Sequence, residues 1–338
     1  MRLDTPFVRL PLTFDAALLA TEITSLPESA WRPHPQGYPG NTALALVAAG
    51  GDPANELTRG PMRPTPWLMQ LPYLRQVMAA LGCSIGRSRL MRIDGNGEAS
   101  LHVDSNYYWA THVRIHIPVV TTSAVEFLCG SARVHMAAGE CWIFDTWSLH
   151  NVLNPAPTRR IHLVCDSVGA PAFWDRVERG HLPHTLHPTP DPNATYVPFQ
   201  PDLDAQPPVE LCNQPVVMTP FEVTHWCSFV LDELRPVATS AETQVRKLTA
   251  LLTQFQRAWT DAWTRHGILV SGHGGYRHLL LALNAALDQF NALPPLRNGV
   301  QVAQLLRQLI VRSALNPDLA LALQDEPQVL HALATASR

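Results

Sequence analysis

The chain has 338 residues, of which 46% are hydrophobic and 16% are charged, and its formal net charge is −3. This length suits one large domain or two ordinary ones, and the composition excludes wholesale disorder. No basic stretch forms a nucleic-acid footprint, no run of about 18 apolar residues could cross a membrane, and the N-terminal residues lack a signal pattern. We therefore expect a cytoplasmic protein that binds neither nucleic acid nor membrane.

Short runs of alternating apolar and polar residues dominate the first half of the chain. Those at 114–119, 125–127, 140–144 and 160–164 predict strands, because successive side chains of a strand face opposite sides. A helix is expected at about 72–78, outside the strands. Many short strands at near-regular spacing favour a sandwich or a barrel. We expect residues 1–180 to form one α+β domain.

The second half changes composition twice. Residues 181–218 are rich in proline, which predicts an extended linker, and Tyr196 and Phe199 would let this segment lie across a neighbouring surface. Residues 219–338 follow a helical period, with a capped start at Thr219 and a second start at Ser240. Further helices are expected at about 275–292, 299–314 and 317–335. This helical C-terminal domain could act as a scaffold, a substrate lid or the surface of a homodimer.

The pattern that carries chemistry is His102-Val103-Asp104, followed by His150. Residues i and i+2 of a strand share a face, so His102 and Asp104 can reach one metal ion together. His150 follows a strand at 140–144 and can supply a third ligand. Two histidines and one carboxylate on one face of an octahedral metal leave three positions open, as non-haem Fe(II) oxygenases require. Taken alone, HxD is a weak signal, and a single histidine in a strand is more often a hydrogen-bonded packing residue.

Arg160 strengthens this interpretation. It begins a strand ten residues after His150, and a guanidinium that projects into a barrel is costly unless it meets an anion. A dicarboxylate co-substrate would supply that anion. Arg114 and His116 share a face of their strand and add inward cations, with His116 cationic if protonated. Alternatively, Arg160 or Arg159 could pair with a structural carboxylate such as Asp166.

Residues 88–169 resemble the aspartyl/asparaginyl β-hydroxylase family, which includes bacterial proline hydroxylases. The resemblance rests on five segments together: His102-Val103-Asp104, Arg114-Ile115-His116-Ile117-Pro118, Met136-Ala137-Ala138-Gly139-Glu140-Cys141-Trp142-Ile143-Phe144-Asp145, His150, and Arg160-Ile161-His162-Leu163-Val164. It implies a double-stranded β-helix (cupin-like jelly roll) core with flanking helices. It also implies Fe(II), 2-oxoglutarate and O2, with succinate and CO2 released as an unactivated carbon is hydroxylated.

The resemblance assigns roles residue by residue. His102, Asp104 and His150 match the iron ligands, and Arg160 matches the arginine that holds the distal carboxylate of 2-oxoglutarate. His116 matches a histidine near the other carboxylate. Arg114 matches an arginine that faces the substrate carboxylate. The implied substrate is an amino acid of the Asp, Asn or Pro type, either free or within a peptide. Animal peptidyl-Asp hydroxylases of the family lack the acidic ligand, so this chain looks closer to the bacterial branch.

Several residues near the motif could have either a structural or a functional role. Tyr107 and Trp109 follow the HxD strand and could line the substrate pocket or pack in the core, as could their neighbour Tyr108. Asp145 and Asn151 flank His150 and could orient it. Three further histidines are expected in packing or supporting positions: His112, His135 and His162.

Two other classes of function compete with the oxygenase. A cupin-like binding or sensing module would keep the barrel and a metal, but it would not need Arg160 or Arg114. A zinc hydrolase would use the same His/Asp/His set with a bound water. Metal preference separates these classes, because zinc should inhibit an oxygenase and support a hydrolase.

Overall fold

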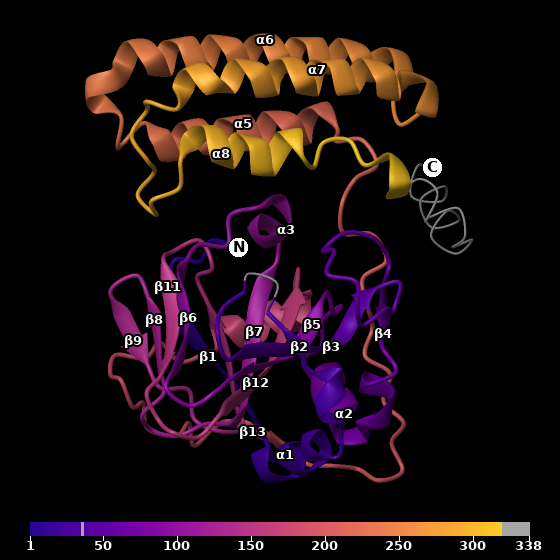
Figure 1. Cartoon of the computed structure of the whole chain (residues 1–338), viewed down its shortest axis with the longest axis vertical. Helices are drawn as coiled ribbons and strands as arrows, with labels where there is room; N and C mark the ends of the chain where they lie inside the picture. The colour runs from indigo at the N-terminus through magenta and orange to yellow at the C-terminus, as the bar shows by residue number, and fades with distance from the viewer. Residues whose placement is uncertain (35–36, 320–338) are drawn as a thin grey trace. The chain divides into compact units, whose positions relative to one another are not determined.

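The computed structural model describes residues 1–34 and 37–319, which form two compact units (Figure 1). The first unit comprises residues 1–104 and 109–211, and the second comprises residues 105–108 and those from 212 onward. The chain is therefore a mixed α/β protein with a helical C-terminal region. In the part of the chain that the structure describes, no helix is long and apolar enough to span a membrane.

Strands make up most of the first unit, with helices before, between and after them. The strands are β1 (Phe7–Phe14), β2 (Arg32–Pro33), β3 (Asn41–Ala49), β4 (Met62–Pro64), β5 (Ser88–Ile93), β6 (Gly97–His102), β7 (Val113–Val120), β8 (Glu126–Cys129), β9 (Ala132–Val134), β10 (Glu140–Phe144), β11 (His150–Asn154), β12 (Arg160–Ser167) and β13 (Thr195–Val197). The helices are α1 (Ala16–Thr24), α2 (Pro72–Ala80) and α4 (Pro171–Glu178), and α3 (Tyr107–Thr111) runs from the second unit back into the first.

Two sheets organise these strands. The larger has nine strands in the order β13-β1-β10-β7-β12-β5-β3-β2, with β4 paired to β3, and the smaller has the order β6-β11-β8-β9. Their pairings are antiparallel except for β1 with β13. The expected strands at 114–119, 125–127, 140–144 and 160–164 and the expected helix at 72–78 are confirmed as β7, β8, β10, β12 and α2.

Alternation along the central strands sorts side chains into two cores. In β10, Cys141 and Ile143 join the core that the larger sheet shares with the helices of this unit, whereas Trp142 and Phe144 join a core that both sheets build. In β7, Ile115 belongs to the helix-side core. Arg114 and His116 therefore point the other way, toward the space between the sheets, as the period-2 pattern predicts.

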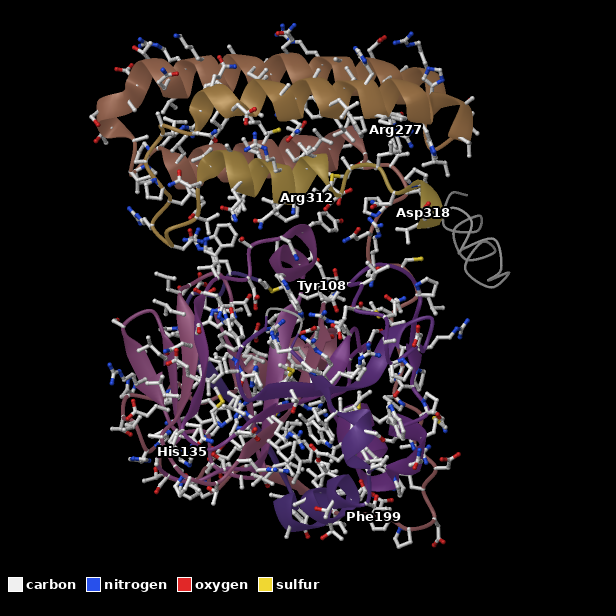
Figure 2. The ribbon with its side chains drawn as sticks, viewed as in Figure 1. Tyr108, His135, Phe199, Arg277, Arg312 and Asp318 are labelled. Carbon is white, nitrogen blue, oxygen red and sulfur yellow. The ribbon has the colours of Figure 1, made fainter. Side chains whose placement is uncertain are left out.

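The proline-rich segment packs onto the first unit over much of its length. Strand β13 pairs with β1, and the Tyr73 hydroxyl donates to the Val197 carbonyl at 2.7 Å. The Tyr73 ring meets Phe199 edge to face at 5.7 Å, at the foot of this unit (Figure 2). Aromatic residues thus hold the segment against a neighbouring surface, the arrangement that Phe199 suggested in the sequence.

The second unit is a helical bundle. Its helices are α5 (Pro220–Leu234), α6 (Glu242–His266), α7 (His273–Ala286) and α8 (Val302–Leu306), the last continuing as a π-helical turn at Arg307–Val311. Helix α6 lies against α5 and α7, and α5 also contacts α8 (Figure 1).

The first two helices of the bundle begin at or near the expected residues. Thr219 caps α5 as expected, because its hydroxyl accepts from the Glu222 N–H. Helix α6 begins at Glu242, two residues after the expected start at Ser240. The helix expected at 317–335 lies outside the described residues except for its first three positions.

Candidate metal centre and anion cavity

Two adjacent strands of the smaller sheet bring the two histidines together. His102 ends β6, His150 begins β11, and the antiparallel register places them opposite each other with ring centroids 4.2 Å apart. Asp104 lies in the loop two residues beyond β6, where its N–H donates to the Thr146 carbonyl. The expectation that one strand carries both His102 and Asp104 is therefore wrong, since β6 ends at His102, but the two side chains still converge.

Backbone carbonyls fix the orientation of both rings. The Nδ1 atom of His102 lies 2.6 Å from the Ser100 carbonyl, and that of His150 lies 2.9 Å from the Ser148 carbonyl. A carbonyl only accepts, so each Nδ1 carries a proton, and Nε2 is the ring nitrogen that could bind a metal. The same contact, with the carbonyl two residues earlier in the chain, would suit both rings as ligands through Nε2.

The donor atoms form a group that fits a metal ion. His102, Asp104 and His150 each offer one ligand atom, and these atoms lie within 4.8 Å of one another. Among the described residues this is the only such group found. His150 Nε2 and Asp104 Oδ2 are buried and lie 3.7 Å apart. His150 Nε2 has no hydrogen-bond partner among the described residues, whereas Asp104 Oδ2 forms an ion pair with Arg114 Nη1 at 2.9 Å. Buried polar atoms are rarely left without a partner, and a cation next to Asp104 would satisfy His150 Nε2.

The protonation states also suit a metal. Burial lowers the pKa of His150 to about 4, so the ring is neutral at physiological pH. Burial alone would raise the pKa of Asp104, but the nearby Arg114, His150 and His102 outweigh it, and the pKa is lowered. His150 and Asp104 therefore offer a neutral imidazole and a carboxylate without first losing protons.

Arg114 is already paired. Its Nε donates to Asp166 at 3.2 Å, its Nη1 lies 2.9 Å from Asp104 Oδ2, and its guanidinium stacks over Trp109 at 3.9 Å from the ring centroid. The alternative in which Asp166 neutralises Arg160 is wrong, because Asp166 serves Arg114 and also lies 4.0 Å from Arg87.

Arg160 has no such partner. The residue is 2% exposed, and its Nε and Nη2 atoms are buried without a hydrogen-bond partner among the described residues. Burial lowers the pKa of Arg160 to about 9, which still leaves it charged at neutral pH. It lines one cavity together with His102, His116 and His150. A buried cation without a counter-charge indicates a site for an anion.

His116 is not one of the inward cations. Burial, followed by the charge of Arg160, lowers its pKa well below the ordinary value, so the ring is neutral. Of the three inward cations expected near a dianion, only Arg160 therefore lacks a counter-charge, since His116 is neutral and Arg114 is paired. Phe127 and Phe144 contact the His116 ring edge to face and give this end of the cavity an apolar wall.

A second cavity opens beside the candidate metal ligands. It is lined by His34, Arg87, Arg89, His102, Asp104, Trp109 and Arg114. Trp109 thus lines a cavity, and its role in substrate binding stays a prediction. Tyr107 lines neither this cavity nor that of Arg160, and its hydroxyl donates to Glu222 within the helical unit. A substrate-binding role for Tyr107 stays a prediction.

Two arginines of this cavity were not identified from the sequence. Arg87 and Arg89 alternate around the start of β5, and both lie near Glu56, at 3.7 and 3.2 Å. The signal that could have found them is a pair of arginines at positions i and i+2 next to a buried strand. Without knowledge of the neighbouring strands, however, such a pair cannot be distinguished from two exposed arginines of an edge strand.

The remaining predicted residues have structural partners. Asp145 accepts from the Trp147 N–H and the Ser148 hydroxyl, which fixes the turn before β11. The His150 ring is oriented by the Ser148 carbonyl rather than by the side chains of Asp145 or Asn151. His112 pairs with Glu210 at 2.7 Å, His135 Nδ1 contacts the Val125 carbonyl, and His162 contacts His116. All three are packing or supporting residues, as expected.

A comparison with known protein families finds a match over this region. The profile of the aspartyl/asparaginyl β-hydroxylase family matches residues 54–169. The chain resembles this family. All six residues that carry the resemblance at the site, from His102 to Arg160, fall inside the matched range. No curated protein sequence matches the chain.

Solved structures with detectable similarity include oxygenases. An oxidoreductase of the 2OG-Fe(II) oxygenase family from Burkholderia pseudomallei is 15% identical, with a TM-score of 0.34 over 46% of this chain and 79% of that one. A Pseudomonas putida prolyl-4-hydroxylase is 13% identical, with a TM-score of 0.33 over 48% and 92%. A Trichoplax adhaerens prolyl hydroxylase is 12% identical, with a TM-score of 0.35 over 48% and 84%. Similarities of this size identify neither a substrate nor a reaction.

Proposed function

We propose that this chain is an Fe(II)- and 2-oxoglutarate-dependent dioxygenase that hydroxylates an unactivated carbon of an amino acid, free or within a peptide. The observation that carries the proposal is Arg160, a buried cation without a counter-charge in the same cavity as His102 and His150. In this proposal the two facing sheets form a double-stranded β-helix.

The residues of the site fit the two groups that this chemistry needs. His102, Asp104 and His150 would hold Fe(II) on one face, which leaves positions for a bidentate co-substrate and O2. Arg160 would take the distal carboxylate of 2-oxoglutarate, and His116 would lie near the other carboxylate. Iron and 2-oxoglutarate supply the oxidising chemistry when bound, and the protein supplies binding, orientation and the exclusion of water.

The arginines that line the second cavity favour a substrate that carries a carboxylate. Arg87, Arg89 and Arg114 bring three positive charges there, balanced by the carboxylates of Asp104, Asp166 and Glu56. A metal ion would share the charge of Asp104, and one cation of the cavity would then lack a full partner. An anionic substrate group next to Arg114 would restore the balance. Trp109 would wall this subsite.

The rival functions make different demands on the same residues. A sensing module of the cupin type has no use for an unpaired buried Arg160. A zinc hydrolase would use the His/Asp/His set with water, and it too leaves Arg160 unexplained. Of the three, only the oxygenase gives this cation an anion to bind.

The test is to incubate the purified protein with Fe(II), 2-oxoglutarate and panels of free amino acids and peptides in air. We expect succinate to form in proportion to a product that has gained one oxygen atom, and zinc to inhibit. Zinc-supported hydrolysis without 2-oxoglutarate turnover would overturn the proposal.

A further inference from the structure

Two buried neutral histidines contact each other through their Nδ1 atoms, at hydrogen-bond distance. His116 on β7 and His162 on β12 are 6% and 2% exposed, and their Nδ1 atoms lie 3.4 Å apart. Both Nε2 atoms are buried without a partner among the described residues. Burial lowers the pKa of each ring well below its ordinary value, so each carries a single N–H.

The shared contact couples the two tautomers. One Nδ1 must donate and the other must accept, because two lone pairs or two N–H groups cannot face each other. If His162 donates from Nδ1, His116 carries its own proton on Nε2. If His116 donates instead, its Nε2 is a bare lone pair and the proton of His162 moves to Nε2. Only these two arrangements keep the hydrogen bond.

The surroundings of the two rings favour the first arrangement. His116 lines the cavity of Arg160, where an anion would need N–H donors and would be repelled by a lone pair. Arg160 lies two residues before His162 on the same face of β12, and after burial it has the largest effect in lowering the pKa of both rings. Its charge acts on both rings, so the anion that it would bind in the cavity decides between the two arrangements.

From this geometry we infer that His162 is a positioning residue that holds His116 as the Nε2–H tautomer, with its donor available to an anion in the cavity. The histidine pair alone restricts the two rings to two arrangements. The choice between them, and donation by His116 to a carboxylate of 2-oxoglutarate, rest on the proposed function. His162 would act through His116 without touching the co-substrate.

The first experiment reads the tautomers directly. Protein labelled with ¹⁵N-histidine and free of metal is observed by long-range ¹H–¹⁵N correlation, with signals assigned from His116→Asn and His162→Asn variants. We expect the proton on Nε2 in His116 and on Nδ1 in His162. A wild-type spectrum with the His116 proton on Nδ1 overturns the inference, whether or not the protein binds 2-oxoglutarate.

The second experiment uses a matched pair of variants. His162→Asn keeps a donor near the position of Nδ1, whereas His162→Leu has similar bulk and no donor. Titration of 2-oxoglutarate into Mn(II)-loaded protein should show roughly tenfold or greater weakening for His162→Leu, the loss expected for one hydrogen bond to a charged group, and near-native affinity for His162→Asn. Equal affinity for both variants, with the His116 tautomer unchanged in His162→Leu, would refute the positioning role. If wild-type protein binds no 2-oxoglutarate but shows the expected tautomers, the proposed function fails while the assignment of the histidine pair stands.

Discussion

Replacing Arg160 with methionine should make the metal-free protein more stable while removing its affinity for 2-oxoglutarate. Methionine is flexible, unbranched and uncharged, so it replaces the aliphatic part of the arginine side chain without the cost of a buried cation. Each pH unit by which a pKa shifts corresponds to about 1.4 kcal/mol. The fall of the Arg160 pKa to about 9 therefore corresponds to roughly 4–5 kcal/mol against the charged form.

Relaxation and water entry reduce that cost in a real protein, so we expect a gain of roughly 1–3 kcal/mol in the free energy of unfolding. Denaturant unfolding of the metal-free protein measures this gain in stability. The control is Arg159→Met, because Arg159 is exposed and directly precedes β12. The control should change stability by less than about 0.5 kcal/mol. Addition of 2-oxoglutarate with Mn(II) should stabilise wild type and the control but not Arg160→Met. A marked loss of stability in Arg160→Met would show that Arg160 has a structural partner, and the anion argument would fail.

Three further predictions follow from the same structure. His150→Ala should abolish coupled succinate formation in a turnover assay, since it removes a ligand, and near-native activity would exclude it as one. The free energy of unfolding should fall as pH drops below about 6.5, because the unfolded chain protonates His116 and His162 while the folded protein keeps both neutral. His162→Asn should reduce that slope by up to about 1.4 kcal/mol per pH unit, and an unchanged slope in denaturant titrations would contradict the neutral assignment. His112→Ala should destabilise the protein by roughly 1–3 kcal/mol, because it leaves a buried oxygen of Glu210 without its hydrogen bond; a loss below about 0.5 kcal/mol in denaturant unfolding would show that the pair contributes little.

Local pattern was sufficient to predict the strands that carry the site. Alternation in β7 and β12 separates Ile115 and Leu163, in the helix-side core, from Arg114 and Arg160 on the other face. Period 2 is a property of the extended backbone itself, so it can be read without knowing the partner strands. The capped start at Thr219 could be predicted for the same reason, since a cap is satisfied within one turn.

Partnerships between distant strands could not be predicted from such patterns. Asp166 could have paired with Arg160 on its own strand, but the register of β12 with β7 places it opposite Arg114. His116 could have been cationic, but it is neutral because the surrounding core desolvates it. The position of Asp104 outside β6 likewise depends on the hydrogen bond from its N–H to the carbonyl of Thr146, more than 40 residues away. Charge states and ion pairs are set by tertiary packing, which a single sequence does not encode locally.

An anaerobic titration of the metal-free protein with Fe(II) and 2-oxoglutarate, followed by visible absorbance, tests the central claim most directly. We predict a weak metal-to-ligand charge-transfer band that requires both additions, develops with one equivalent of each and is absent in Arg160→Met at the same concentrations. Correctly folded wild-type protein that shows neither the band nor binding of 2-oxoglutarate would contradict the account.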